Sequence, residues 1–171
     1  TAIIPPGNFI DDGSCIIFGC TDPMADNYYE DATECEDGTL DNCCIYTEPL
    51  QVSFGNVDNG TMEIYIIIPE YENDSDYIYG FQFYIEGVTL TGASGGLAAE
   101  NNFTVMVSGN LVLGFTTTID FIGPGEGVLT NLTFTQNDGA DEACLTLGDN
   151  GAFSNQNSVP IPVIFSDCYE F

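Results

Sequence analysis

The chain has no positively charged side chain. Its 171 residues contain no Lys, Arg or His but 27 Asp plus Glu, which gives a formal net charge of -27. An average composition would supply about twenty Lys plus Arg to a chain of this length. The fold must therefore form without side-chain salt bridges, and its self-repulsion must be balanced from outside, most simply by metal cations. Nucleic acid and anionic membrane are excluded as direct partners, because both are bound through basic residues.

The apolar content nevertheless indicates a folded protein. Apolar residues make up 44% of the chain and aromatic residues 12%, which is too much for a disordered acidic tail. No apolar run reaches the roughly 20 residues of a membrane span, so we expect no direct membrane insertion. No signal peptide is present, so we expect a processed product or an excerpt of a secreted chain.

Most of the chain after Pro49 alternates apolar and polar residues with a period of two, which is typical of strands with one face in a core. Turn signals such as Asp58-Asn59-Gly60 and Ser108-Gly109-Asn110 separate the runs. Roughly seven to nine short strands are expected, which predicts an all-β antiparallel sandwich, with one helical turn or two around residues 97–101. The residues expected to face the core are Met62, Ile64, Ile66, Ile68, Phe81, Phe83, Ile85, Phe103, Val105, Val107, Leu111, Leu113, Phe115, Val128, Leu132, Phe134, Ile161, Val163 and Phe165.

The seven cysteines are expected to form disulfides. Their positions are Cys15, Cys20, Cys35, Cys43, Cys44, Cys144 and Cys168. A zinc cluster is the alternative, but His and the CxxC spacing typical of zinc sites are missing. We expect Cys144 to pair with Cys168 across the sandwich; the alternative is that Cys168 meets another chain. The odd count leaves one cysteine free, bonded between chains or paired outside the sequence.

The composition changes near Pro49, from Cys, Asp and turn formers to β-branched and aromatic residues. Three segments are expected. They are an N-terminal arm with the end of a preceding repeat at 1–17, a Cys/Asp-rich calcium-type module at 18–48, and a β-sandwich at 49–171.

Residues 18–46 resemble an Asp/Cys-rich module of secreted bacterial surface proteins, whose pattern is FGCTDPxAxNYxPxAxxDDGSCxY. The matching residues are Cys20, Thr21, Asp22, Pro23, Ala25, Asn27, Tyr28, Ala32 and Tyr46. Glu30 stands where the pattern has Pro, and the closing segment 36–44 is longer than DDGSC. Asp11-Asp12-Gly13-Ser14-Cys15 matches the closing half of a preceding copy. The resemblance implies an extracellular, calcium-rich surface, and hence a secreted or cell-surface location.

Residues 49–166 resemble the cohesin-like, immunoglobulin-like sandwich. The segments that carry the resemblance are Val52-Ser53-Phe54, Tyr79-Gly80-Phe81-Gln82-Phe83, Gly87-Val88-Thr89-Leu90-Thr91 and the run 125–134. Family members with known roles are scaffold or adhesion modules that bind protein partners, so the resemblance implies a binding or structural role.

Calcium is the expected cofactor, because it takes six to eight oxygen ligands from Asp, Glu, Asn and backbone carbonyls. The candidate ligands are Asp11, Asp12, Asp22, Asp26, Asn27, Asp31, Glu34, Glu36, Asp37 and Asp41. The alternative is a solvated acidic surface. A second acidic group comprises Glu70, Glu72, Asp74 and Asp76, for which a flexible acidic hairpin loop is the alternative.

Four N-glycosylation sequons begin at Asn59, Asn73, Asn102 and Asn131, and the alternation places Asn131 on the outer face of its strand. Without His or Lys, catalysis would rest on paired carboxylates as in glycosidases. The carboxylates in the stretch 119–127, such as Asp120 and Glu126, are read as turn residues. We therefore expect that the protein is not an enzyme.

The first ten residues are apolar and contain Pro5-Pro6. Their side chains Ile3, Ile4, Phe9 and Ile10 can cover their own sandwich or add as a strand to a neighbour's open edge. Head-to-tail donation would produce a homopolymer. The leading hypothesis is therefore an extracellular structural protein that assembles into a surface filament or array. The alternative is an adhesion or cohesin-type module that binds a protein or glycan partner.

Overall fold

The computed structural model describes Cys20, Glu30–Asp31 and residues 48–71 and 77–171. The chain divides into two compact units, Thr1–Thr47 and Glu48–Phe171. This division lies one residue from the expected boundary at 48/49. The predicted N-terminal arm lies outside the described residues, as does all of the predicted calcium-type module except Cys20, Glu30, Asp31 and Glu48. Among the described residues, no helix is long and apolar enough to span a membrane.

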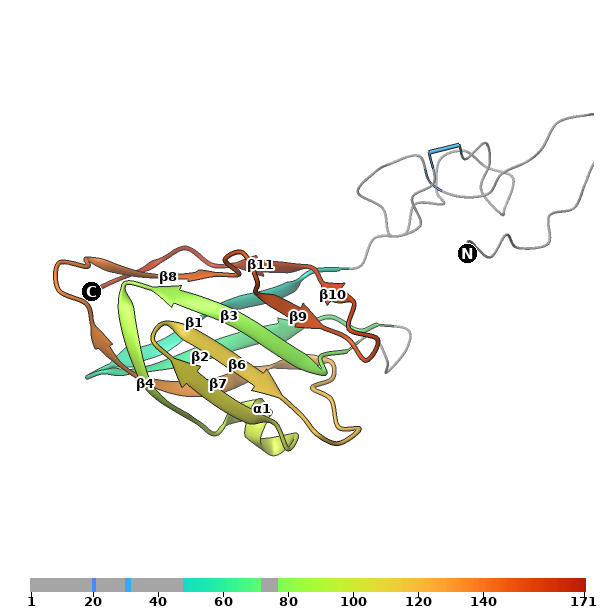
Figure 1. The fold of residues 1–171 in the computed structure, drawn as a ribbon, viewed down its shortest axis with the longest axis horizontal. Coiled ribbons are helices and arrows are strands. Elements are labelled where there is room, and N and C mark those ends of the chain that lie inside the picture. The colour runs from blue at the N-terminus through green and yellow to red at the C-terminus, as the bar shows by residue number, and fades with distance from the viewer. Residues whose placement is uncertain (1–19, 21–29, 32–47, 72–76) are drawn as a thin grey trace, which may run out of the picture. The chain divides into compact units, whose positions relative to one another are not determined.

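The second unit is built almost entirely from strands (Figure 1). The longer strands are β1 (Leu50–Asp58), β2 (Thr61–Ile68), β3 (Gly80–Glu86), β4 (Val88–Ser94), β5 (Thr104–Ser108), β6 (Leu111–Phe115), β7 (Gly125–Gln136) and β8 (Glu142–Thr146). The shorter ones are β9 (Ala152–Ser154), β10 (Pro160–Ile161), β11 (Val163–Phe165) and β12 (Tyr169–Glu170). The one helix in the described part of this unit, α1 (Gly96–Glu100), lies where the helical turn was predicted.

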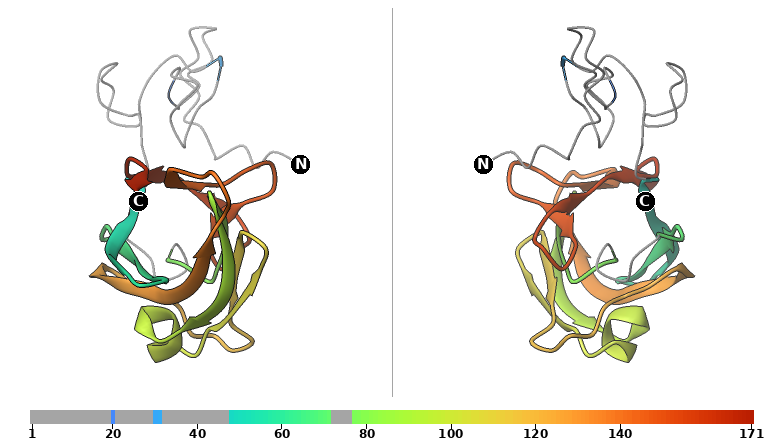
Figure 2. Two further views of the ribbon diagram at one scale, coloured as in Figure 1. Left: turned by 90° about the vertical axis from the view of Figure 1, so that its left-hand side faces the viewer. Right: turned by 90° about the vertical axis from the view of Figure 1, so that its right-hand side faces the viewer.

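The strands form two sheets that enclose one core. One sheet has the order β11-β1-β2-β7-β4, and the other contains β10-β9-β3-β6-β5 together with β8 and β12. Every pair of strands is antiparallel except β1 and β11, which are parallel. The predicted all-β, antiparallel sandwich is confirmed. End-on views show the two sheets wrapped around the interior (Figure 2).

The structure contains more strands than the roughly seven to nine expected, because β9 to β12 are only two or three residues long. Segments this short carry no readable alternation. Pro162 separates β10 from β11 and carries the chain from one sheet to the other. This placement fits proline, which cannot donate a ladder hydrogen bond within a strand.

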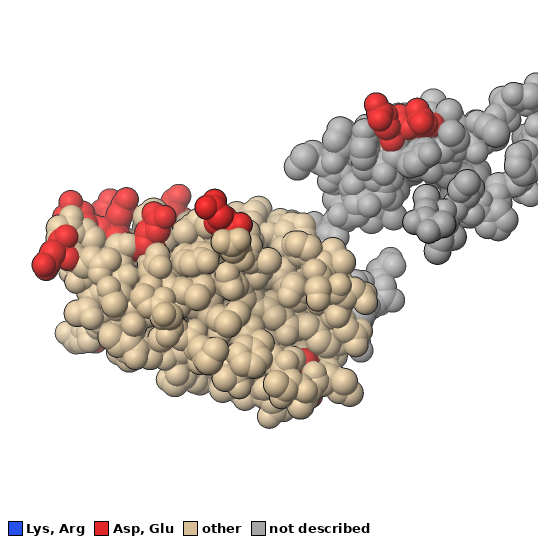
Figure 3. All heavy atoms as spheres, viewed as in Figure 1, with Lys and Arg blue, Asp and Glu red and all other residues tan. Residues whose placement is uncertain are grey.

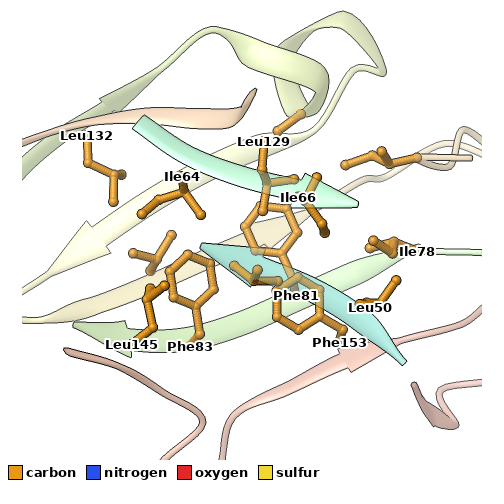
Figure 4. Close-up of a cluster of buried hydrophobic side chains, with 14 of the residues drawn as sticks. Leu50, Ile64, Ile66, Ile78, Phe81, Phe83, Leu129, Leu132, Leu145 and Phe153 are labelled. Carbon is orange, nitrogen blue, oxygen red and sulfur yellow. The ribbon is translucent and has the colours of Figure 1, made fainter. Parts of the chain in front are cut away.

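The core consists of aliphatic and aromatic side chains from both sheets (Figure 4). Ile64 and Ile66 from β2 face Phe81 and Phe83 from β3, and Phe153 from β9 stacks on both of these rings. The predicted inward residues of β2 and β3 are therefore confirmed; Met62, Ile64, Ile66, Ile68, Phe81, Phe83 and Ile85 are all buried.

The prediction for β7 is wrong at Val128. The register shifts between Ile64 and Tyr65, so Ile64 lies opposite Thr130 and Tyr65 lies opposite Val128. This bulge turns Val128 to the outer face and buries Leu129. It also places the Thr130 hydroxyl in the core, where it has no hydrogen-bond partner among the described residues. A bulge adds one residue to one strand and reverses the alternation beyond it, so a uniform period of two cannot reveal it.

Candidate protein-binding face

The carboxylates avoid one face of the sandwich. Among strands β3, β5, β6, β9 and β10, the only acidic residue is Glu86, the last residue of β3. In the space-filling view the acidic side chains gather along the edge near β8, and the face formed by β3 and β6 is almost free of them (Figure 3). An uncharged surface is notable on a chain whose net charge is -27.

This surface is the outer side of the hairpin β5–β6 and of the adjoining β3. Leu113 lies between Gln82 and Met106 in one cross-strand row, and Leu111 lies between Tyr84 and Ser108 in the next. Met106 is 50% exposed. We call this surface the uncharged face and define it by Gln82, Tyr84, Thr104, Met106, Ser108, Leu111, Leu113 and Phe115.

The sequence prediction placed Leu111, Leu113 and Phe115 in the core, and this is wrong. The turn Gly109-Asn110 joins β5 and β6 so that Val107 pairs with Val112. Directly paired residues share a face. Val107 packs against the core, so Val112 is also inward and its two neighbours, Leu111 and Leu113, point outward.

The inner side of β6 fixes this orientation. Val112 is fully buried, and Gly114 lies against the ring of Phe81, where a Cβ atom on Gly114 would come within 2.0 Å of the ring. No larger residue fits between this strand and Phe81 without displacing the ring. The run Leu-Val-Leu-Gly-Phe is apolar at almost every position, so hydrophobicity alone could not have chosen its inward face. The signal that could have done so is the two-residue turn, which sets the register of the hairpin.

Polar groups at one border of the uncharged face are already engaged. The Gln82 amide donates hydrogen bonds to the Tyr84 hydroxyl at 3.2 Å and to the Asn150 carbonyl at 2.9 Å. Gly148 lies close to the Tyr84 ring. A Cβ atom added to Gly148 would stand 3.1 Å from the nearest atoms of that ring. The segment 147–151 between β8 and β9 therefore borders the face and holds Tyr84 in place.

An aromatic stack lies elsewhere in this unit. The Tyr77 ring packs between those of Tyr71 and Phe121, with centroid distances of 5.3 Å and 5.6 Å. The Tyr71 hydroxyl donates to the Glu48 carbonyl at 2.9 Å. Burial, together with the charge of Glu48 and the neighbouring Tyr77, raises the pKa of Tyr71 to about 12. This phenol therefore stays protonated at neutral pH and acts as a hydrogen-bond donor.

Asp120 has the structural role expected of a turn residue. Its Oδ2 accepts hydrogen bonds from the Thr118 hydroxyl at 2.6 Å and from the Asn102 amide at 3.0 Å. The reading of Glu126 as a turn residue is wrong, because Glu126 lies in β7, where it is exposed.

Three of the four predicted glycosylation sites lie in the described residues. Asn59 is exposed in the turn between β1 and β2. The Asn102 amide is bonded to Asp120, and the Asn131 amide donates to the Ser94 carbonyl at 3.2 Å. Asn73 lies outside the described residues, and use of any of the four sequons stays a prediction.

The predicted calcium ligands are almost all outside the described residues. Asp31 is described and exposed. The others are not described: Asp11, Asp12, Asp22, Asp26, Asn27, Glu34, Glu36, Asp37 and Asp41. In the second acidic group, Glu70 is exposed and Glu72, Asp74 and Asp76 are not described. The assembly residues Ile3, Ile4, Phe9 and Ile10 are also not described, so the calcium site and the arm stay predictions.

Cys144 and Cys168 form a disulfide, as predicted. The bridge does not cross between the two sheets, however. Ala143 pairs with Tyr169 in the antiparallel β8–β12 ladder, and continuing that register sets Cys144 opposite Cys168, with Cα atoms 4.4 Å apart. The disulfide therefore fastens β12 to β8 within one sheet. Cys20 is buried and disulfide-bonded, whereas Cys15, Cys35, Cys43 and Cys44 are not described.

No protein-family model matches the chain, and no curated protein matches it. Among solved structures, the chain is similar to the sixth cohesin of scaffoldin B from Acetivibrio cellulolyticus, which was solved with a Cel5 dockerin. The two share 13% identity and a TM-score of 0.47, and the match covers 70% of this chain and 95% of the cohesin. It is also similar to the seventh ScaB type I cohesin from Pseudobacteroides cellulosolvens, at 17% identity and a TM-score of 0.46 over 69% and 88% of the two chains. A non-cellulosomal cohesin from Archaeoglobus fulgidus shows 13% identity and a TM-score of 0.45 over 69% and 86%. Likenesses at this level do not assign the chain to a family.

Proposed function

We propose that the sandwich is a protein-binding module and that its partner docks on the uncharged face. The observation that supports this most is the presence of Leu111, Leu113 and Met106 side by side on the outside of a sheet in a strongly acidic chain. Contiguous apolar surface that a soluble protein leaves outside its core is typical of an interaction site. The paired strands present these side chains at fixed spacing, which limits the entropy lost on binding.

The charge distribution restricts the partner. The uncharged face would take an apolar centre, and its carboxylate neighbours at the strand ends, Glu86 and Glu142, would favour Lys or Arg at the partner's rim. If two copies of this chain docked on this face, the carboxylates Glu86 and Glu142 at its border would meet carboxylates and no basic group, which disfavours self-association there. We therefore propose a different protein, apolar at its centre and basic at its edge.

The proposal is tested with Leu113→Glu, which places a charge in the middle of the uncharged face. Partners are captured from a secreted fraction on the immobilised wild-type protein and on the variant, identified by mass spectrometry, and then purified for calorimetry; a dockerin domain is included as a defined probe. We expect a partner whose affinity falls at least about tenfold with the variant. Raising the salt concentration should slow its association, because the basic rim is steered by the acidic border.

The matched control is Ile67→Glu, which places the same charge on the outer side of β2 in the opposite sheet, where Ile67 is 37% exposed. This variant should bind normally. Equal binding by wild type and Leu113→Glu, or equal loss in both variants, would rule out the uncharged face as the docking surface. Melting curves of both variants confirm that the fold is retained.

A second candidate function, assembly into a filament, is favoured by the free edge of β11. Among the described strands, β11 has β1 as its only partner, and its central residue Ile164 is 57% exposed. Such an edge can accept a strand from another chain. The apolar residues 3–10 are the proposed donor, and continued donation from copy to copy would extend a surface filament.

Filament formation is tested by sedimentation and electron microscopy of the full chain, of a chain lacking residues 1–10, and of Ile164→Lys. The wild type should form concentration-dependent polymers. Both changes should leave monomers, because one removes the donor and the other places a charge on the acceptor edge. Polymers formed equally by all three proteins would exclude strand donation to β11.

A further inference from the structure

One end of the sandwich carries an open cleft that is separate from the uncharged face. It measures about 430 Å³ and is formed by the turn between β1 and β2, the end of β7, and the segment that includes β12. Small-molecule sites typically occupy about 300–1,000 Å³. The left view of Figure 2 looks onto this end of the unit.

Four aromatic rings lie in a continuous row at this end. Phe54 contacts Tyr169 with ring centroids 6.2 Å apart, Tyr169 contacts Phe171 at 5.8 Å, and Phe171 contacts Phe134 at 5.9 Å. Phe54 and Phe134 are partly buried and pack against the core, whereas Phe171 is 43% exposed. The row therefore anchors Phe171 in the sandwich and leaves part of its ring free toward solvent.

Hydrogen-bonding groups surround these rings. Asn59, Asp58 and Thr135 line the cleft, are exposed, and make no side-chain hydrogen bond within the described part of the chain. Gln136 also lines it; its amide nitrogen donates to the Ala140 carbonyl at 2.6 Å, and its amide oxygen remains available as an acceptor. The turn holds Asn59 in place, because Asn59 and Gly60 take the positive φ values of 46° and 79° that a type I′ hairpin turn requires.

We propose that this cleft binds a neutral carbohydrate. A sugar ring has an apolar C–H face and a rim of hydroxyl groups. The C–H face complements the electron-rich face of an aromatic ring such as Phe171. Carboxylate, amide and hydroxyl side chains such as Asp58, Asn59 and Thr135 can pair with the sugar hydroxyls as donors or acceptors.

The charges of the chain decide between classes of ligand. Asp58 lines the cleft and the chain has no basic residue, so an acidic sugar such as a uronic acid would be repelled. An apolar peptide fits poorly, because Val57 is the only aliphatic residue in the lining and the remaining non-aromatic residues other than Gly60 are polar or acidic. A neutral oligosaccharide matches both the rings and the polar rim.

The test is an NMR and calorimetric titration of the protein made in a host without N-glycosylation, because Asn59 begins a sequon. The probes are the neutral hexasaccharides of β-1,4-glucose, α-1,4-glucose, β-1,4-mannose and β-1,4-N-acetylglucosamine, with hexagalacturonate as the acidic probe. At least one neutral probe should bind and shift the backbone amides of Asn59, Gly60 and Gln136. Phe171→Ala should weaken that binding at least about tenfold, and hexagalacturonate should not bind.

Two further variants make the test specific. Gln136→Ala alters only the polar rim and should also weaken binding, whereas Met106→Ala, on the uncharged face, should leave it unchanged. The proposal is overturned if no neutral probe shifts these amides at about 10 mM, if Phe171→Ala binds as well as wild type, or if hexagalacturonate binds equally well. It is also overturned if the same amides shift with protein concentration alone, since a second copy would then occupy the cleft. None of these outcomes depends on the protein partner proposed for the uncharged face.

Discussion

Gly114→Ala tests the orientation of β6 at its most sensitive point. The new Cβ would stand 2.0 Å from the Phe81 ring, whereas carbon atoms pack at about 3.5–4.0 Å. The ring must therefore move by about 1.5 Å or more. Phe81 is buried, and its ring centroid lies 6.0 Å from those of Phe83 and Phe103 and 5.8 Å from that of Phe153, so the surrounding cluster leaves it no free space.

Overpacking a core usually costs about 1–3 kcal/mol, and we expect Gly114→Ala to fall near the upper end, at about 3 kcal/mol. Equilibrium urea unfolding, followed by far-ultraviolet circular dichroism, measures this loss. The matched control is Gly127→Ala in β7, whose Cβ would meet Leu97 at an ordinary 3.4 Å. That control should change the free energy of unfolding by less than about 1 kcal/mol.

A loss below about 0.5 kcal/mol for Gly114→Ala would refute the register, because Gly114 would then face solvent and Leu113 the core. The double variant Gly114→Ala with Phe81→Leu adds a check. The smaller side chain relieves the clash, so the two changes together should destabilise by less than the sum of the single changes.

Four other outcomes are expected. Replacing Cys144 and Cys168 by Ala removes a bridge across 24 residues and should lower the free energy of unfolding by about 3 kcal/mol in the same urea assay. Thr130→Val removes a buried hydroxyl that has no partner and should raise it by about 1 kcal/mol; a loss instead would show that this hydroxyl is satisfied. Folding raises the pKa of Tyr71 from 10 to about 12, so the contribution of this phenol to the free energy of unfolding is complete below pH 10 and is lost as the pH rises toward 12. Tyr71→Phe should reduce this pH-dependent loss by on the order of 1 kcal/mol after solvent screening. Chelator should lower the melting temperature and millimolar calcium should raise it; an unchanged melting temperature would contradict the predicted calcium site.

The strands with one polar and one apolar face were predictable from the sequence. In β2, Glu63 and Tyr65 alternate with Met62, Ile64 and Ile66, so only one face could be buried. The same holds for β3 from Phe81 to Glu86. The turn at Asn59-Gly60 was equally predictable from the sequence, because few other residue pairs adopt its positive φ values.

The uncharged face was missed for a physical reason. In β6 both faces are apolar, and the choice between them depends on pairing with β5 across the two-residue turn. The bulge at Leu129 in β7 likewise depends on how β2 and β7 align, not on hydrophobicity. Strand pairing decides both cases, through the two-residue turn for β6 and through long-range register for β7, and local alternation carries no information about it.

The cleft at the end of the sandwich was missed because its rings come from three distant parts of the chain. Phe54 and Phe134 were read as ordinary strand residues, and Phe171 follows β12, which is too short to predict. Only the disulfide between Cys144 and Cys168, which was predicted, hinted that the last residues are tied to the sandwich.

The role of the uncharged face is measured most directly by methyl NMR with a soluble paramagnetic agent, recorded on the free protein and on its complex with the captured partner. In the free protein, the methyl groups of Leu111 and Leu113 should be relaxed strongly and those of Val112 weakly. Adding the partner should protect Leu111 and Leu113. Docking on this face would be contradicted if, in the free protein, the methyl groups of Val112 were relaxed strongly and those of Leu113 were protected. It would also be contradicted if the relaxation of the Leu113 methyl groups did not change when the partner is bound.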